Sequence, residues 1–193
     1  AATVNSLALS SWHRIGPFGA GNFDEAHAKS FVNEAAVDLK KVHGKLKWVD
    51  AKNYVDGKVH TLNGANSAHY FYRTIQSGSA RPLELSLGSD GSFRIWLNGK
   101  LVADQKIIPR VAPDQNKVKV NLLAGENKLL VKVANGVGPY GFYFKTQRMR
   151  AWTASRAVPN AGIMTWDGSF TPVQVKKVDD EKDIALIQKC FML

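Results

Sequence analysis

The sequence predicts an all-β fold, an antiparallel β-sandwich with only short helices. Between Ala68 and Thr146, short stretches alternate apolar and polar residues, and turn-forming residues separate them. No stretch with helical periodicity lies between these strands, which argues against a parallel α/β sheet. The 193 residues, 45% of them hydrophobic, are enough for one domain with a sizeable core.

The strands are expected in regular succession, at residues 69–75, 83–87, 93–97, 101–102, 118–122, 129–133 and 141–145. The pair Asn98-Gly99 predicts a type I′ hairpin turn, because both residues tolerate positive φ. Gly125 and Asn127 predict a tight reversal between two buried strands. Asp90 is expected to accept backbone N–H groups within its own turn.

The N-terminal third is less regular. Residues 12–18 are expected to form an entering strand and residues 24–31 a short helix, whereas residues 37–42 suit either a helix or a strand. After an extended piece at Leu46 and Trp48, Asp56-Gly57 predicts a second hairpin-type turn before Val59.

Beyond residue 149 the pattern changes, and two parts are predicted: a β-sandwich module over residues 1–150 and a C-terminal extension over residues 151–193. The extension is expected to contain short strands and a terminal helix that packs on the sandwich. Acidic residues at 179–181 favour the start of that helix. Cys190 would lie on it as a small buried apolar residue.

Three segments carry a resemblance to a known family. Residues 87–102 (LGSDGSFRIWLNGKLV) resemble a recurrent hairpin of galactose-binding-like jelly rolls, and residues 123–133 (LAGENKLLVKV) are similar to its companion strand pair. Residues 12–18 (WHRIGPF) resemble the opening of such modules in multidomain exported bacterial proteins. The resemblance implies a carbohydrate-binding type of module in a secreted, periplasmic or cell-surface protein. Asp90 is followed by Gly91 where many relatives have two aspartates, so a cation-assisting role of paired carboxylates is not carried over.

Catalysis and cofactors are not expected. The five histidines show no metal-binding spacing: His13, His27, His43, His60 and His69. The single cysteine excludes an internal disulfide and a cysteine metal cluster. The candidate carboxylates for glycosidase chemistry are Asp50, Asp56, Asp90 and Asp104. All of them lie in turn-like segments, where a hydrogen bond to their own backbone is the simpler role. The sequence therefore predicts a protein that is not an enzyme and that holds no metal or cofactor.

A sugar site requires an aromatic ring beside polar groups. The aromatic residues outside confident core positions are Trp48, Tyr54, Tyr140, Trp152 and Trp166, and Asn53 and Asn135 are the neighbouring amides. We therefore predict ligand contacts from Trp48, Asn53, Tyr54, Asn135, Tyr140 and Trp152. Trp12 and Trp96 are expected to be structural.

Net charge supports a rival interpretation. The formal charge is +10, and strand alternation predicts a basic sheet face containing Lys117, Lys119 and Lys132. Such a face would favour acidic polysaccharides. Nucleic acid ranks low because the regular aromatic interleaving of a single-strand binder is absent. A third hypothesis is a spacer domain that contacts only adjacent domains of its parent chain.

Overall fold

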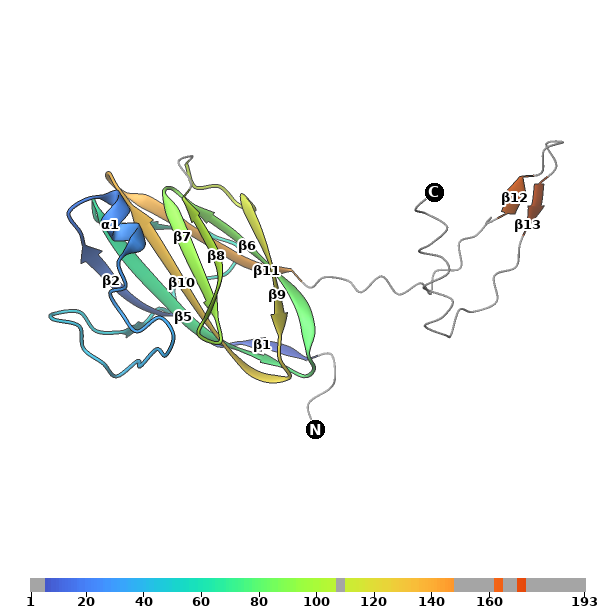
Figure 1. Cartoon of the computed structure of the whole chain (residues 1–193), viewed down its shortest axis with the longest axis horizontal. Helices are drawn as coiled ribbons and strands as arrows, with labels where there is room; N and C mark the ends of the chain where they lie inside the picture. The colour runs from blue at the N-terminus through green and yellow to red at the C-terminus, as the bar shows by residue number, and fades with distance from the viewer. Residues whose placement is uncertain (1–5, 107–109, 148–161, 165–169, 173–193) are drawn as a thin grey trace. The chain divides into compact units, whose positions relative to one another are not determined.

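The computed structural model describes residues 6–106, 110–147, 162–164 and 170–172 (Figure 1). The chain divides into two compact units, residues 1–149 and residues 150–193. The first unit is an antiparallel β-sandwich, which confirms the predicted fold class. Its described residues contain no helix long and apolar enough to cross a membrane.

Two antiparallel sheets form the sandwich. The strand order of the large sheet is β3 (Val49–Asp50), β2 (His13–Gly19), β5 (Ser67–Ser77), β10 (Gly125–Asn135), β7 (Ser92–Leu97) and β8 (Lys100–Lys106), with β1 (Leu7–Leu9) paired to β5. The order of the small sheet is β4 (Val59–Leu62), β11 (Tyr140–Gln147), β6 (Arg81–Ser89) and β9 (Asn116–Leu122). The one helix described, α1 (Phe23–Ala28), is shorter than predicted.

In the second unit the described backbone consists of two short antiparallel strands, β12 (Gly162–Met164) and β13 (Phe170–Pro172). The predicted terminal helix, Cys190, Trp152 and Trp166 lie outside the described residues. The packing of residues 151–193 on the sandwich remains a prediction.

The main core lies between the two sheets. Alternate residues of the long strands point inward, among them Phe71 of β5 and Phe142 of β11, whose rings stack with centroids 4.2 Å apart. Trp12 is 2% exposed and packs edge-on against Phe144 at 4.9 Å, so its predicted structural role is confirmed. A period-two pattern that buries one face produces this arrangement.

A second apolar cluster lies on the outer face of the large sheet. Its buried members include Tyr70, Tyr72, Trp96 and Leu130, and the loop from Lys29 to Trp48 covers them. The loop is neither helix nor strand at residues 37–42, and its only ladder contact is the isolated bridge between His43 and Leu46. An irregular loop can occupy this place because the sheet beneath it supplies the apolar surface.

Lys132 is not part of a basic face, contrary to the prediction. It projects from the large sheet, whereas Lys117 and Lys119 belong to the small sheet. Its side chain is 1% exposed, and its Nζ donates to the carbonyl oxygens of His27 at 2.8 Å and Lys29 at 2.6 Å. Lys132 therefore fastens the end of α1 to the outer face of the sheet.

The turn predictions have mixed outcomes. Asn98 and Gly99 have φ values of 53° and 78° and join β7 to β8, which confirms the type I′ hairpin. The hairpin predicted at Asp56-Gly57 is wrong, because the strands on either side, β3 and β4, belong to different sheets. Asp90 was expected to bond within its own turn, and this prediction is wrong. Its Oδ1 accepts a hydrogen bond from the backbone N–H of Val111, which lies in another loop.

Candidate ligand-binding site

A hollow of about 370 Å³ lies on the outer face of the large sheet, and we call it the first hollow. Its lining comes from strands β5, β7 and β10, the β7–β8 turn and the covering loop. The lining residues include Glu34, Tyr72, Trp96, Glu126, Lys128 and Leu130. The volume lies within the range typical of small-molecule sites.

The floor of the first hollow is one row of side chains across three neighbouring strands. Leu130 of β10 pairs with Tyr72 of β5 on one side and with Trp96 of β7 on the other. Strands are about 4.8 Å apart, so the backbones that carry the two aromatic residues are roughly 10 Å apart. Both rings are largely buried in the outer cluster, with Trp96 6% and Tyr72 8% exposed. The floor is thus formed by two packed aromatic side chains, of which a small part is accessible.

Polar groups stand at the rim. Glu126 and Lys128 are exposed, and neither side chain has an ion-pair or hydrogen-bond partner within the described part of the chain. Burial raises the pKa of the Tyr72 phenol, and the Glu126 carboxylate adds to the shift, so this hydroxyl remains a donor at neutral pH. The hollow therefore offers an ammonium, a carboxylate and a hydroxyl beside two aromatic rings.

The covering loop supplies the opposite wall. Glu34 holds this part of the loop on the sheet, because its Oε1 accepts a hydrogen bond from the Tyr70 hydroxyl at 2.6 Å and its Oε2 one from Ser30 at 2.8 Å. Gly99 is required beneath the loop, since a Cβ there would overlap the backbone oxygen of Ala35. These contacts fix the shape of the first hollow without a ligand.

A second hollow of about 210 Å³ lies beside the first under the same loop. Ala36 and Val37 line both hollows and form the ridge between them. The polar lining residues of the second hollow are Asn33, Asp38, Lys41, His43 and Trp48. Trp48 lies edge-on to Tyr72, with ring centroids 6.3 Å apart, so an aromatic contact links the two hollows.

The predicted site residues do not form one group. Trp48 lines the second hollow, whereas Tyr54 and the exposed Asn53 follow β3 on the chain. The ring of Tyr54 already contacts His60, at a centroid distance of 4.7 Å, and the guanidinium of Arg14 lies 5.5 Å from its centroid. A ligand at Tyr54 would compete with these contacts. Sugar contacts from these residues remain predictions.

Tyr140 and Asn135 are not open loop positions, contrary to expectation. Tyr140 begins β11 and is 2% exposed, and its hydroxyl lies 2.6 Å from Nδ1 of His69. Asn135 ends β10, and its Nδ2 donates to the carbonyl oxygens of Val137 and Gly138, each at 2.9 Å. The Tyr140 hydroxyl therefore joins β11 to β5, and Asn135 holds the loop between β10 and β11. Trp152 lies outside the described residues.

The sequence contained a signal for the first hollow. Phe93, Ile95 and Leu97 alternate inward, so Trp96 had to point away from the main core, and the same parity turns Tyr72 outward. Aromatic side chains at the outward-facing positions of neighbouring strands indicate an outer sheet face that is apolar rather than polar. Glu34 carried no comparable signal, because its position depends on an irregular loop.

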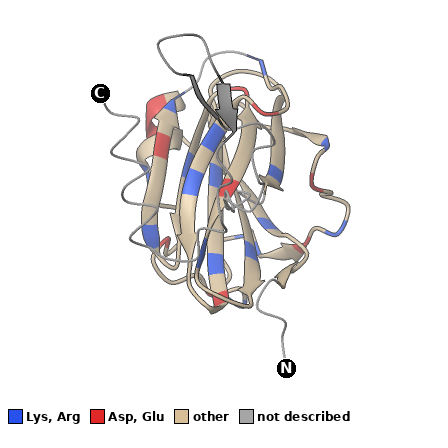
Figure 2. Ribbon diagram, turned by 90° about the vertical axis from the view of Figure 1, so that its right-hand side faces the viewer, with Lys and Arg blue, Asp and Glu red and all other residues tan. Residues whose placement is uncertain are grey.

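The basic positions are distributed over several strands and loops rather than gathered in one arm (Figure 2). Within the described residues, no group of three or more His, Cys, Asp or Glu side chains is placed to hold a metal ion. On the small sheet Lys117 pairs with Glu84 at 3.4 Å, which reduces the positive charge of that face.

No family model matches the chain, and no curated protein is similar in sequence. The galactose-binding-like family therefore remains a prediction.

Several solved structures align with part of the chain. The sugar-binding PA14 domain of an RTX adhesin is 12% identical over 71% of this chain and 88% of its own, with a TM-score of 0.39. A family 35 carbohydrate-binding module from Clostridium thermocellum is 14% identical over 46% of this chain and 89% of its own, with a TM-score of 0.34. An α-xylosidase from Xanthomonas citri is 19% identical over 45% of this chain, with a TM-score of 0.33, and only 10% of that enzyme is covered.

Proposed function

We propose that the chain is a non-catalytic carbohydrate-binding module and that its ligand site is the first hollow. The observation that carries the proposal is the row of Trp96, Leu130 and Tyr72 beneath the unpaired side chains of Glu126 and Lys128. The floor residues also support the covering loop, but the exposed Glu126 and Lys128 have no partner among the described residues and are free to contact a ligand.

The chemistry of this hollow matches that of a sugar. A pyranose ring has apolar C–H faces that pack on aromatic rings, and hydroxyl groups at its edge that exchange hydrogen bonds. The Glu126 carboxylate can accept such bonds, the Lys128 ammonium can donate them, and the Tyr72 hydroxyl can do both. Because the rim contains opposite charges, neutral sugars suit this hollow as well as charged ones.

A binding role is favoured over hydrolysis. Glycoside hydrolysis requires two carboxyl groups that act on opposite sides of the scissile bond. In the first hollow Glu34 bonds through both carboxylate oxygens to Tyr70 and Ser30, so it serves to position the loop. Release of reducing ends from a bound oligosaccharide would contradict the non-catalytic part of the proposal.

The setting of the module is also part of the proposal. We place it in a larger exported protein, secreted, periplasmic or at the cell surface, where a polysaccharide would be the partner of the hollow. Adjacent domains of the parent chain would be the partners if the module were a spacer. A preference for acidic polysaccharides would come from the second hollow.

The test is a panel of immobilised neutral and acidic oligosaccharides, probed with the full chain and with a Glu126→Ala/Lys128→Ala double variant. We expect the wild-type protein to bind a subset of the panel and the variant to bind that subset at least about tenfold more weakly, because hydrogen bonds to charged groups contribute about 1.5–3 kcal/mol each. Both side chains are exposed, so the variant should fold normally.

The matched control removes the same two charges elsewhere. Glu84 and Lys119 face each other on the outer side of the small sheet, and Glu84→Ala/Lys119→Ala should leave binding unchanged. Equal losses in both variants would contradict the location of the site. Binding of no glycan by the wild-type chain would contradict the function and favour the spacer hypothesis.

A further inference from the structure

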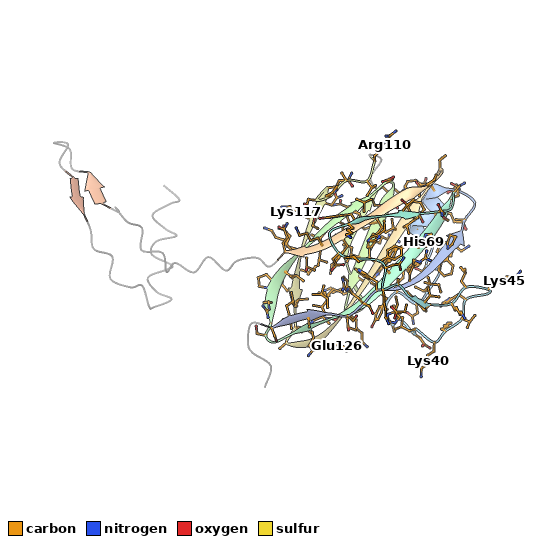
Figure 3. The ribbon with its side chains drawn as sticks, turned by 180° about the vertical axis from the view of Figure 1, so that it is seen from behind. Lys40, Lys45, His69, Arg110, Lys117 and Glu126 are labelled. Carbon is orange, nitrogen blue, oxygen red and sulfur yellow. The ribbon has the colours of Figure 1, made fainter. Side chains whose placement is uncertain are left out.

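The second hollow differs from the first in charge. It lies within the most basic stretch of the described chain, where residues 39–49 include Lys40, Lys41, Lys45 and Lys47 and no acidic residue. Lys40 and Lys45 project from this loop away from the sandwich (Figure 3). Even with the flanking Asp38 and Asp50 included, lysines outnumber carboxylates in this stretch, whereas the rim of the first hollow carries one charge of each sign.

The lining of the second hollow is rich in donors. Lys41, His43 and Trp48 line it, and their side chains carry an ammonium group, an imidazole ring and an indole N–H that is itself covered in the absence of a ligand. The one carboxylate in the lining, that of Asp38, already accepts the backbone N–H of Lys40 at 2.9 Å. An anion entering the hollow would therefore meet the Lys41 ammonium group and ring N–H donors, with the Asp38 carboxylate as the one opposing charge in the lining.

Trp48 supplies an independent sign of a missing acceptor. Trp48 is only 8% exposed, and its Nε1 is a buried atom without a hydrogen-bond partner among the described residues. An unmet buried N–H costs about 1–3 kcal/mol, and such groups in folded proteins usually have a partner. A ligand oxygen seated in the hollow would supply it.

We infer that the second hollow binds the anionic substituent of an acidic glycan, a carboxylate or a sulfate, while the first hollow holds the neighbouring sugar ring. The inference rests on the proposed carbohydrate-binding function and names its substrate class. The Ala36–Val37 ridge separates the hollows, so one glycan can reach both by crossing it. The anion pairs with Lys41 and accepts the Trp48 N–H after a small movement of the side chains over the indole.

The test follows the Trp48 indole N–H by NMR in the ¹⁵N-labelled full chain, with Trp48→Phe identifying the resonance by its loss. We titrate with sodium glucuronate, with sodium sulfate and with glucose, at constant ionic strength. The resonance should shift in a saturable manner with glucuronate and sulfate but not with glucose. Lys41→Gln should weaken the glucuronate effect by about tenfold, the loss of one charge-assisted bond.

The control is Lys40→Gln, which removes the same charge from the neighbouring residue, since Lys40 does not line the hollow. It should reduce the effect by no more than about twofold, because exposed charges act weakly at a distance. Equal losses in Lys40→Gln and Lys41→Gln, or no shift of the indole resonance, would overturn the inference.

Failure of this inference differs from failure of the proposed function. If neutral oligosaccharides bind and the Glu126→Ala/Lys128→Ala variant loses them, while glucuronate and sulfate leave Trp48 unchanged, the acidic substrate class alone is wrong. If no oligosaccharide of the panel binds and glucuronate does not shift the resonance, both are wrong.

Discussion

Replacing Asp56 with alanine should lower the free energy of unfolding by about 3 kcal/mol, because it leaves a buried arginine charge without its partner. The Nη1 of Arg73 donates to both carboxylate oxygens of Asp56 at 2.8 Å, and only 7% of the Arg73 side chain is exposed. The guanidinium also lies 4.5 Å from the ring centroid of Trp12, whose Nε1 donates to Asp56 at 3.0 Å. Asp56 thus satisfies two buried donors, and urea unfolding measures the loss.

Asp50→Ala provides the matched control. Its carboxylate pairs with Lys52 at 3.5 Å, and that pair is mostly exposed, so its removal should change the free energy of unfolding by less than about 1 kcal/mol. A loss at Asp56 no larger than that at Asp50 would show that the Arg73–Asp56 pair does not support the edge of the sandwich.

Acid should destabilise the fold through His69. Burial lowers the pKa of His69 to about 4, and the nearby Arg14 charge adds to the shift. The unfolded chain, with a histidine pKa near 6.5, therefore binds a proton before the folded chain does. Stability from the neutral ring is present above about pH 6.5 and is lost as the pH falls toward 4, by up to about 3 kcal/mol.

The measurement is urea unfolding at several pH values between 7 and 4. His69→Phe should flatten this part of the profile, although the loss of the Tyr140 contact will lower its stability at pH 7. His60→Gln is the control, because His60 is only partly buried and bonds to the backbone oxygen of Val55. If the free energy of unfolding of His69→Phe fell with pH as steeply as that of the wild type, His69 would not be the group responsible.

The sequence predicts the sandwich well because its strands have one buried face. Residues 117–122 alternate strictly between exposed and buried, residues 83–87 alternate apolar and polar side chains, and the φ values at Asn98-Gly99 are those that its two residues favour. The errors occur where long-range contacts decide the structure. Lys132 follows the alternation of its strand, yet α1 and the loop after it bury its ammonium group.

The candidate site was less accessible to sequence reasoning. Trp48 was identified as an aromatic outside the main core, and it does line a hollow. Tyr140 was misplaced, because a tyrosine beside glycine and proline resembles a loop residue until its hydroxyl is seen against His69. The outer cluster depends on the irregular loop from Lys29 to Trp48, which has no periodic pattern.

The central claim is that the outer face of the large sheet binds a sugar, and an NMR footprint tests it most directly. The full ¹⁵N-labelled chain is titrated with the oligosaccharide that binds most strongly in the panel, and backbone amide shifts are followed. We predict the largest changes at Tyr72, Trp96 and Lys128, around the first hollow. Changes confined to Asn53 and Tyr54, or to Lys117 and Lys119 on the small sheet, would contradict it.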